Sequence, residues 1–218
     1  KGAKTKSANV VGQTMKLNPH GDMAIYETLV RLTIGNDSLL HPLIESKGNF
    51  GKVYSRDMRF AAPRYTEVKL SDITAELFQD IDKETVDFVD NYDGTTKEPL
   101  LLPAVFPNIL VNPNQGIAVS MASNICSFNL KEVCEAAIAY IKNDNINLLD
   151  YLKAPDFSTG GDIIVNTSDL EKIYETGRGS FKIRGKYRVD KSNNCVEIYE
   201  IPYTTTAEAI IDSVANLV

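Results

Sequence analysis

Several patterns that mark particular chemistries are missing from this chain of 218 residues. Its three cysteines, Cys126, Cys134 and Cys195, form no CxxC pair, so the sequence predicts neither a structural zinc site nor a disulfide framework. With only His20 and His41, a metal site built on two histidines is not expected. There is no GxxxxGKS/T phosphate loop, HExxH helix or GxSxG elbow, so the common nucleotidase, zinc protease and esterase sites are not indicated.

Long apolar runs and unusual compositions are missing as well. No run approaches the roughly eighteen apolar residues that a membrane span requires. Apolar residues make up 43% of the chain and charged residues 24%, which is typical of a soluble globular protein with one large or two small domains. The chain opens with KGAKTK, without an initiator Met or a signal peptide, so we expect a piece of a longer, cytoplasmic protein.

Positive charge is concentrated in the first third of the chain. The net charge is −6, but residues 1–70 hold 11 Lys and Arg against 6 Asp and Glu, and residues 71–218 hold 12 against 23. The two parts therefore carry +5 and −11. A basic front on an acidic body favours a polyanionic partner. A chance fluctuation of charge remains the alternative.

Helical periodicity is clearest near the N-terminus. Residues 7–17 read as a helix capped by Ser7, and the segment NPHGD interrupts it. A second helix is predicted to begin at Asp22 as its N-cap, with Ile25, Leu29 and Leu32 facing the core. Two helices joined by a tight turn in a basic region are typical of a helix-turn-helix, although many helical hairpins bind nothing.

The remaining chain alternates helices with short strands. We predict helices over residues 71–89 and 127–143, capped by Ser71 and Ser127, and a helix ended by Gly177. Residues 100–125 are rich in Pro, Gly and β-branched residues, so short strands and loops are expected, with a second subdomain starting near residue 100.

One predicted strand, residues 181–190, places cations on alternate positions. Because successive side chains of a strand point to opposite faces, one face would carry Lys182, Arg184, Lys186 and Arg188. A solvated outer face is the simple interpretation, but four cations without an intervening acid favour phosphate contact.

The stretch AAPRYTEVKL, residues 61–70, offers the most specific chemistry. A phenol has a pKa near ten and is a poor nucleophile unless it is deprotonated or assisted by charge. Arg64, directly before Tyr65, could favour phenolate or hold a phosphate. The alternative, which the dipeptide alone favours, is that Tyr65 is a core aromatic with a polar tip.

Motifs along the whole chain resemble the breakage-reunion region of the A subunit of bacterial type IIA DNA topoisomerases, DNA gyrase and topoisomerase IV. They occur in the family's order with little or no gapping. The matching stretches are VVGQTMKLNPHGDMAIYETLVR, KGNFG, AAPRYTEVKL, DKETVDFVDNYDGTTKEPLLLPAVFPNILVN, GIAVSMASNI, FNLKEV, TGRG and EIPY.

The resemblance implies a function and roles for single residues. Tyr65 would attack the DNA backbone and form a reversible 5′-phosphotyrosyl link in the gate DNA, which permits strand passage and a change of supercoiling. Arg64 would contact the scissile phosphate region, and His20 would lie near the cleavage site. Ile117 matches an apolar wedge that bends the DNA by entering between base steps.

The resemblance also implies a fold and partners. The fold would be α+β, with a winged-helix (CAP-like) domain over residues 1–99 and a partial tower domain over residues 100–218, truncated before the coiled coil. The partners would be double-stranded DNA and a B subunit that binds ATP and supplies Mg²⁺, in an A2B2 complex of the full-length protein. The implied DNA-binding residues are Lys6, Lys16, Asp22, Met23, Arg31, Lys52, Ile117, Lys182 and Arg184.

The chain departs from the family pattern at several positions. Leu17 and Asn18 replace an aromatic residue and a first histidine, Lys47 replaces a usual Gln, and Pro63 replaces a usual Met. These changes keep two alternatives open, a non-catalytic DNA-binding winged-helix module and an inactive paralogue.

A further departure concerns drug contacts. Met23 stands where most members carry Ser or Thr, while Glu27 keeps the acid one turn later. The resemblance implies that these two positions anchor a water–metal bridge to fluoroquinolones. Because a thioether has no hydroxyl to donate, we expect weak poisoning by these drugs.

Overall fold

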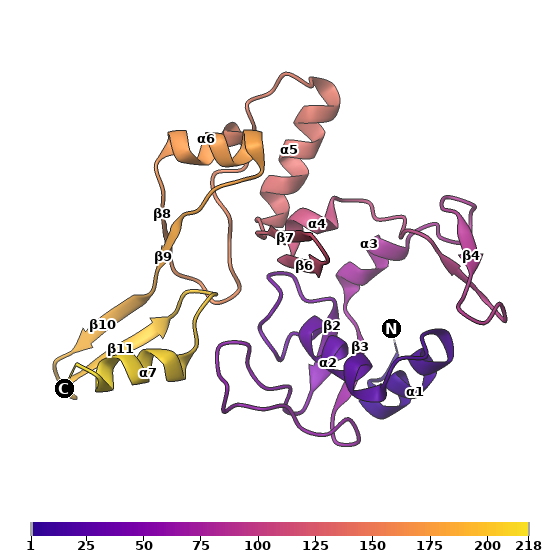
Figure 1. Ribbon diagram of the computed structural model, residues 1–218, viewed down its shortest axis with the longest axis horizontal. Coiled ribbons are helices and arrows are strands. Elements are labelled where there is room, and N and C mark those ends of the chain that lie inside the picture. The colour runs from indigo at the N-terminus through magenta and orange to yellow at the C-terminus, as the bar shows by residue number, and fades with distance from the viewer. Residues whose placement is uncertain (1, 218) are drawn as a thin grey trace. The chain divides into compact units, whose positions relative to one another are not determined.

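The computed structural model describes residues 2–217, which form two compact units. The first contains the chain up to Val53 and Met58–Asn108, and the second contains Tyr54–Asp57 and the chain from Ile109. Each unit combines helices with small antiparallel sheets, which is compatible with the predicted α+β class (Figure 1). The functional boundary near residue 100 stays a prediction.

The first unit is built on two helices and a three-stranded antiparallel sheet of order β1-β3-β2. A separate hairpin pairs β4 with β5. Its elements are β1 (Thr5–Lys6), α1 (Ser7–Leu17), α2 (Asp22–Leu32), β2 (Ile44–Lys47), β3 (Glu67–Leu70), the 3-10 turn η1 (Asp72–Thr74), α3 (Ala75–Phe78), β4 (Phe88–Asp90) and β5 (Lys97–Pro99). The short helix α4 (Asn108–Val111) starts at the end of this unit.

The core of the first unit lies between α1, α2 and the sheet. It is formed by apolar side chains that are at most 8% exposed, namely Val11, Tyr26, Leu29, Val30, Ile44, Phe50 and Val68. Ile25 and Leu32 pack against this core, so the predicted inward face of the second helix is confirmed. The sheet and α2 thus hold one another through burial of apolar surface.

Two predicted helix caps in this unit are wrong. The N-cap of α1 is Lys6, and Ser7 lies inside the first turn, fully buried, where its backbone N–H donates to the carbonyl of Thr66 (3.0 Å). The N-cap of α2 is Gly21, and Asp22 is the first helical residue. An acid in the first turn still favours the helix through its dipole.

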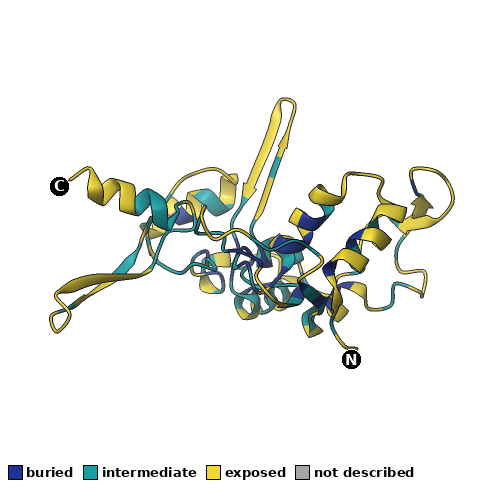
Figure 2. Cartoon of the chain, turned by 90° about the horizontal axis from the view of Figure 1, so that it is seen from below, coloured by how far each residue is buried: buried dark blue, intermediate teal, exposed yellow. Residues whose placement is uncertain are grey.

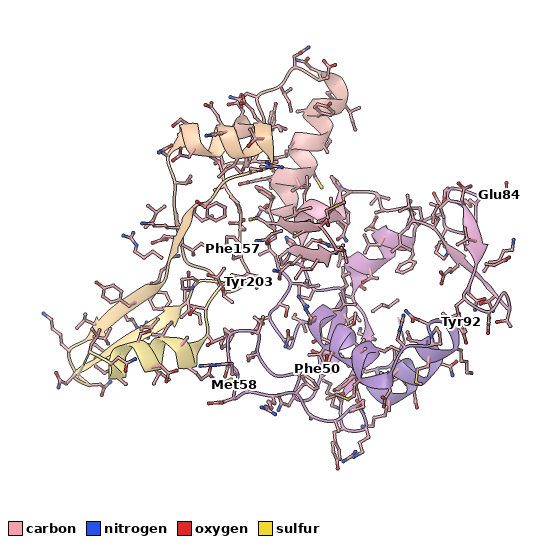
Figure 3. The ribbon with its side chains drawn as sticks, in the orientation of Figure 1. Phe50, Met58, Glu84, Tyr92, Phe157 and Tyr203 are labelled. Atoms are coloured by element: carbon pink, nitrogen blue, oxygen red, sulfur yellow. The ribbon has the colours of Figure 1, made fainter. Side chains whose placement is uncertain are left out.

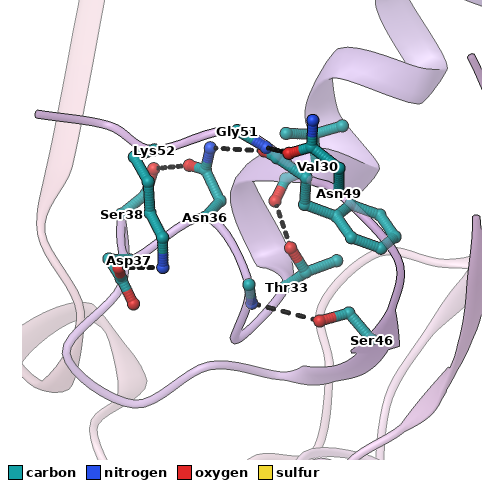
Figure 4. Close-up of polar contacts among 11 residues, drawn as sticks. Val30, Thr33, Asn36, Asp37, Ser38, Ser46, Asn49, Gly51 and Lys52 are labelled. Carbon is teal, nitrogen blue, oxygen red and sulfur yellow. Dashed lines mark hydrogen bonds and ion pairs between the residues drawn. The ribbon is translucent and has the colours of Figure 1, made fainter. Parts of the chain in front are cut away.

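A polar network holds residues 33–52, which follow α2 and include the short strand β2 (Figure 4). The Asn36 side chain donates to the carbonyl of Phe50 (3.0 Å), and Gly35 N–H donates to the Ser46 hydroxyl (3.1 Å). Lys52 pairs with Asp37, with 2.5 Å between Nζ and Oδ2. These bonds fix a segment that has few backbone ladder contacts of its own.

The second unit contains three two-stranded sheets among its described residues, β6–β7, β8–β9 and β10–β11. Its elements are β6 (Asn114–Ala118), β7 (Met121–Ile125), α5 (Leu130–Lys142), the 3-10 turn η2 (Leu148–Asp150), β8 (Asp162–Ile164), α6 (Thr167–Thr176), β9 (Lys182–Arg184), β10 (Lys186–Asp190), β11 (Cys195–Glu200) and α7 (Ala207–Ala215). Gly177, in the left-handed conformation, ends α6 as predicted.

The core of the second unit is small, as the few dark blue segments of Figure 2 show. Its buried apolar residues are Val111, Phe128, Val133, Ala136, Leu152 and Leu170. Phe157 and Tyr203 stack with 5.7 Å between ring centroids (Figure 3). Aromatic pairs thus supplement a modest aliphatic core.

Three further predictions for the elements need correction. The helix expected over residues 71–89 ends at Phe78, because Asp80 and Glu84 adopt left-handed backbone conformations. The cap of α5 is Asn129, whose side chain accepts from two backbone N–H groups, and not Ser127.

The strand expected over residues 181–190 is divided at Gly185 into β9 and β10, which pair with different strands. A Cβ at Gly185 would lie 2.8 Å from the carbonyl oxygen of Glu200, so the backbone approach at this break requires glycine.

Candidate functional site

Tyr65 is a surface residue and not a core aromatic. Its side chain is 65% exposed, so the alternative interpretation of Tyr65 as a core aromatic with a polar tip is wrong. It occupies the last position of a β-turn in which its N–H donates to the carbonyl of Ala62 (3.0 Å). Pro63 takes the second position of this turn, where its fixed φ is favoured, so the replacement of the usual Met by Pro suits the local backbone.

Arg64 lies against the ring of Tyr65. The centre of its guanidinium is 4.6 Å from the ring centroid, within the range of a cation–π contact. Arg64 is itself exposed and forms no ion pair with another residue in 2–217. An exposed phenol therefore has a cation beside it that is free to meet an anion.

The backbone on both sides of Tyr65 is tied to the rest of the first unit. Ala61 N–H donates to the carbonyl of Asn49 (2.9 Å), and Ala8 N–H, at the start of α1, donates to the carbonyl of Pro63 (3.1 Å). After the tyrosine, the chain enters β3, which pairs with both β1 and β2. The turn is thus held at its two ends while the Tyr65 side chain faces solvent.

A buried group of three hydroxyls lies beneath the turn. The Tyr26 hydroxyl lies 2.8 Å from the carbonyl oxygen of Ala61, to which it can donate, and 2.9 Å from Thr66 Oγ1, where either hydroxyl can be the donor. Thr66 Oγ1 donates to the Ser7 hydroxyl (2.8 Å). Burial raises the pKa of Tyr26, partly offset by its bond to Thr66, so Tyr26 stays a protonated donor. Our sequence reasoning missed these residues, although Tyr26, three positions before Leu29, lies on the helix face predicted to be buried.

Four predicted positions lie around the start of α2. His20 is exposed and lines a groove of about 300 Å³ between α1 and α2, and within residues 2–217 no hydrogen bond joins it to Tyr65. Asp22 accepts a hydrogen bond from the N–H of Met23 (2.9 Å). Met23, 51% exposed, and Glu27 are four residues apart on α2, so they lie on neighbouring turns of one face.

The predicted DNA-binding cations of the first unit differ in their partners. Lys16 and Arg31 occupy the last turns of α1 and α2, are exposed, and make no ion pair within the described chain. Lys52 is engaged with Asp37. Lys6 pairs with Glu67 at 2.9 Å and holds the pKa of that carboxyl below its usual range.

The predicted contacts of the second unit lie on the β6–β7 hairpin and on strand β9. Ile117 lies near the tip of the β6–β7 hairpin, opposite Ala122, and is 84% exposed. An apolar side chain that exposed is available for insertion into another molecule.

Acids from neighbouring strands meet the cations of β9 and β10. Arg184 lies 3.7 Å from Asp162, Lys186 3.1 Å from Glu200, and Arg188 2.6 Å from Glu197. Lys182 alone of the four has no ion-pair partner in residues 2–217. The face is therefore a mixed-charge surface, and the prediction of a purely cationic one is wrong.

The part of the chain that the structure describes holds no metal-binding set. Within residues 2–217, no three His, Cys, Asp or Glu side chains are grouped so that they could hold a metal ion. The carboxylate ligands that Mg²⁺ prefers are thus not assembled here, and we derive no step through a metal held by this chain. In the same residues, no helix is long and apolar enough to cross a membrane.

Comparison with known proteins places the chain in one family. The family model of the DNA gyrase/topoisomerase IV A subunit matches residues 1–218. The DNA gyrase A subunit of Ureaplasma parvum is 45% identical over 98% of this chain and 26% of its own length. The corresponding gyrase protein of Rickettsia typhi is 46% identical over 98% of this chain and 24% of its own, and that of Borreliella burgdorferi is 43% identical over 97% and 26%.

The chain thus spans about a quarter of the length of these relatives. The match covers every described element of both units, including the turn that carries Tyr65. The chain belongs to the family of DNA gyrase and topoisomerase IV A subunits.

Proposed function

We propose that this chain is the DNA-cleaving and rejoining part of the A subunit of a type IIA topoisomerase, with Tyr65 as its nucleophile. The observation that carries the proposal is the exposed phenol of Tyr65, on an anchored turn with the Arg64 guanidinium 4.6 Å from its ring. Membership of the family of gyrase A subunits supports it. A guanidinium beside the phenol can hold a phosphodiester and stabilise the charge that develops on it.

The reaction conserves the number of phosphoester bonds. The Tyr65 oxygen bonds to phosphorus, the bond from phosphorus to the 3′ oxygen breaks, and the leaving oxygen takes up a proton. The 5′ phosphate stays linked to the protein, so attack by the 3′ hydroxyl reverses the step and releases the tyrosine. Because the break is stored in an ester, resealing needs no separate source of ligation energy.

The other site residues take supporting roles in this proposal. His20, Lys16 and Arg31 would meet DNA at the two helices of a winged-helix domain, and Met23 and Glu27 would be its drug-contact positions. Ile117 would enter between base steps and bend the gate DNA, trading a few kcal/mol of unstacking, roughly, for a larger wrapped surface. The second unit would then be a partial tower domain.

The partners belong to the same proposal. DNA duplex is the substrate, and a B subunit supplies ATP hydrolysis and Mg²⁺ in a two-fold complex of full-length chains, in the cytoplasm. The names of the relatives support a gyrase-type complex, and the lack of a metal-holding group in residues 2–217 suits a metal that comes with the partner.

Covalent capture tests the nucleophile. The full-length A chain is combined with its B subunit, Mg²⁺ and labelled duplex DNA, and complexes are trapped with denaturant. We expect a 5′-linked adduct from the wild type and none from Tyr65→Phe. Tyr187→Phe, which removes a hydroxyl of nearly equal exposure (66%), is the matched control and should give a wild-type yield.

The opposite result selects the alternative. If neither the wild type nor the variants give an adduct while salt-sensitive DNA binding persists, the chain is a topoisomerase-like fold that only holds DNA. An adduct that survives Tyr65→Phe would assign the nucleophile to another residue.

A further inference from the structure

We infer that Tyr26, Thr66 and Ser7 are positioning residues for Tyr65, which set the rate of DNA cleavage without touching the DNA. This inference rests on the proposed function, since it concerns the geometry of the same nucleophile. It assigns to the three buried hydroxyls a task beyond stability, because their bonds reach the carbonyl of Ala61 and the side chain of Thr66, on the two sides of Tyr65.

The three residues are almost fully buried beneath a turn whose tyrosine is exposed. Ser7 and Thr66 are 0% exposed and Tyr26 is 1% exposed, while Tyr65, one residue before Thr66, is 65% exposed. Buried hydroxyls are retained in a core only where their hydrogen bonds are satisfied. Here they are satisfied by one another and by the carbonyl of Ala61, so the group is complete within the first unit.

These hydrogen bonds hold the chain on both sides of Tyr65. Tyr26, from the middle of α2, holds Ala61, four residues before Tyr65, and also Thr66, directly after it. Ser7, from the first turn of α1, holds Thr66 a second time through its backbone N–H (3.0 Å). Both helices of the helix pair are therefore connected to the two ends of one short turn.

This arrangement fits the needs of an in-line displacement. The Tyr65 hydroxyl has no hydrogen-bond partner among the described residues, so its place depends on the backbone beneath it and on Arg64. A reacting atom that is displaced by about 1 Å can lose roughly a hundredfold in rate. Helix α2 would also link the tyrosine to the DNA. A helix that contacts DNA and is hydrogen-bonded to the turn would fix the position of Tyr65 relative to the bound duplex.

The hydroxyls are tested one at a time in full-length A chain with B subunit, Mg²⁺ and saturating labelled duplex. Tyr26→Phe keeps the edge-to-face contact of its ring with Phe60 (5.5 Å between centroids) and removes only the oxygen. Thr66→Val replaces the hydroxyl by a methyl group of similar size, and Thr66→Ser keeps the hydroxyl. Covalent adduct formation, duplex affinity and urea unfolding are measured for each.

Thr33→Val is the matched control for lost stability. Thr33 is also 0% exposed, lies in the same unit, and its hydroxyl donates to the carbonyl of Val30 (2.7 Å), away from Tyr65 (Figure 4). We expect Tyr26→Phe and Thr66→Val to slow adduct formation about tenfold or more while duplex affinity stays within about twofold. Thr66→Ser should restore most of the rate, and Thr33→Val should lower stability without slowing the reaction.

Three results would overturn the inference. Adduct formation in Tyr26→Phe and Thr66→Val could match the wild type, it could fall only as far as in Thr33→Val, or it could fall because duplex affinity is lost. If one of these two variants does not fold, the other decides by the same comparison with Thr33→Val, since each removes one hydroxyl of the same group. A wild type that forms no adduct at all would instead refute the proposed function.

Discussion

At the scale of single residues, burial separates the two tyrosines nearest the turn. Tyr26 is 1% exposed, and burial raises its pKa, so it serves as a permanent donor to the carbonyl of Ala61. Tyr65 is 65% exposed beside the charge of Arg64. The same phenol is thus a structural link in one place and a candidate nucleophile in the other, because only one of them can reach a substrate.

Met23 gives a prediction at this scale. Its thioether lies on α2 four residues before Glu27, and it has no hydroxyl for the water–metal bridge to fluoroquinolones that we propose for these two positions. Met23→Ser should therefore lower the drug concentration that gives half-maximal cleavage complexes by about tenfold, the effect of one good hydrogen bond. The measurement is a cleavage assay with the A and B subunits over a series of drug concentrations.

Glu27→Ala is the control for this prediction. Placed in the Met23→Ser background, it should remove the gain, because the bridge needs both positions. Strong poisoning of the unmodified chain that is abolished by Glu27→Ala and indifferent to Met23→Ser would contradict our interpretation.

At the scale of elements, the sequence predicted what local periodicity controls. The helices over residues 7–17 and from 22 onwards follow from their apolar spacing, and Gly177 ends α6 for the expected steric reason. The cap predicted at Ser7 failed because a tertiary contact competes for this residue. Ser7 is committed to Thr66, a residue distant in sequence, and is therefore unavailable as a cap.

The prediction of a purely cationic strand face was wrong for a related reason. Arg184 and Arg188 are neutralised by Asp162 and Glu197 on neighbouring strands, and the pattern of a single strand cannot show such cross-strand pairs. Among the site residues, the motif singled out Arg64 and Tyr65, but the hydroxyls beneath them depend on contacts between α1, α2 and β3 that periodicity does not reveal.

The loop after strand β2 gives the next prediction. Gly51 adopts a φ of +66°, and a Cβ there would lie 2.6 Å from the carbonyl oxygen of Met58. Gly51→Ala should therefore lower the free energy of unfolding by about 1–3 kcal/mol, from backbone strain and the contact together. Urea unfolding followed by circular dichroism measures this loss.

A second glycine provides the comparison. Gly12 lies in the middle of α1, and a Cβ there would have no atom within 4 Å. Gly12→Ala should raise the free energy of unfolding by about 0.5–1 kcal/mol, because alanine loses less backbone entropy in a helix. Equal effects of the two substitutions would show that the close approach at Gly51 is not as the structure describes.

At the scale of the whole molecule, two features bear on what this chain can do alone. They are the distribution of its charge and the share of its relatives' length that it spans. The first 70 residues carry +5 and the rest carry −11, so a DNA-binding front has to work against an acidic body. The chain also spans only about a quarter of its relatives. Under the proposed function, this chain would supply a nucleophile and part of a DNA surface, while other parts of the complex would supply the remainder.

Residues 1–218 alone should therefore bind duplex DNA weakly and form no covalent adduct with it. The reason is that the proposed function assigns the metal to the B subunit, while this chain contributes Tyr65 and the Arg64 guanidinium beside its ring. Purified chain is incubated with Mg²⁺ and labelled duplex, trapped with denaturant, and compared with Tyr65→Phe and with full-length A and B subunits. Binding that weakens as salt rises, and helical circular dichroism, establish that the chain is folded. Mg²⁺-dependent adducts from this chain without a partner, absent in Tyr65→Phe, would show that the cleavage chemistry is complete within it.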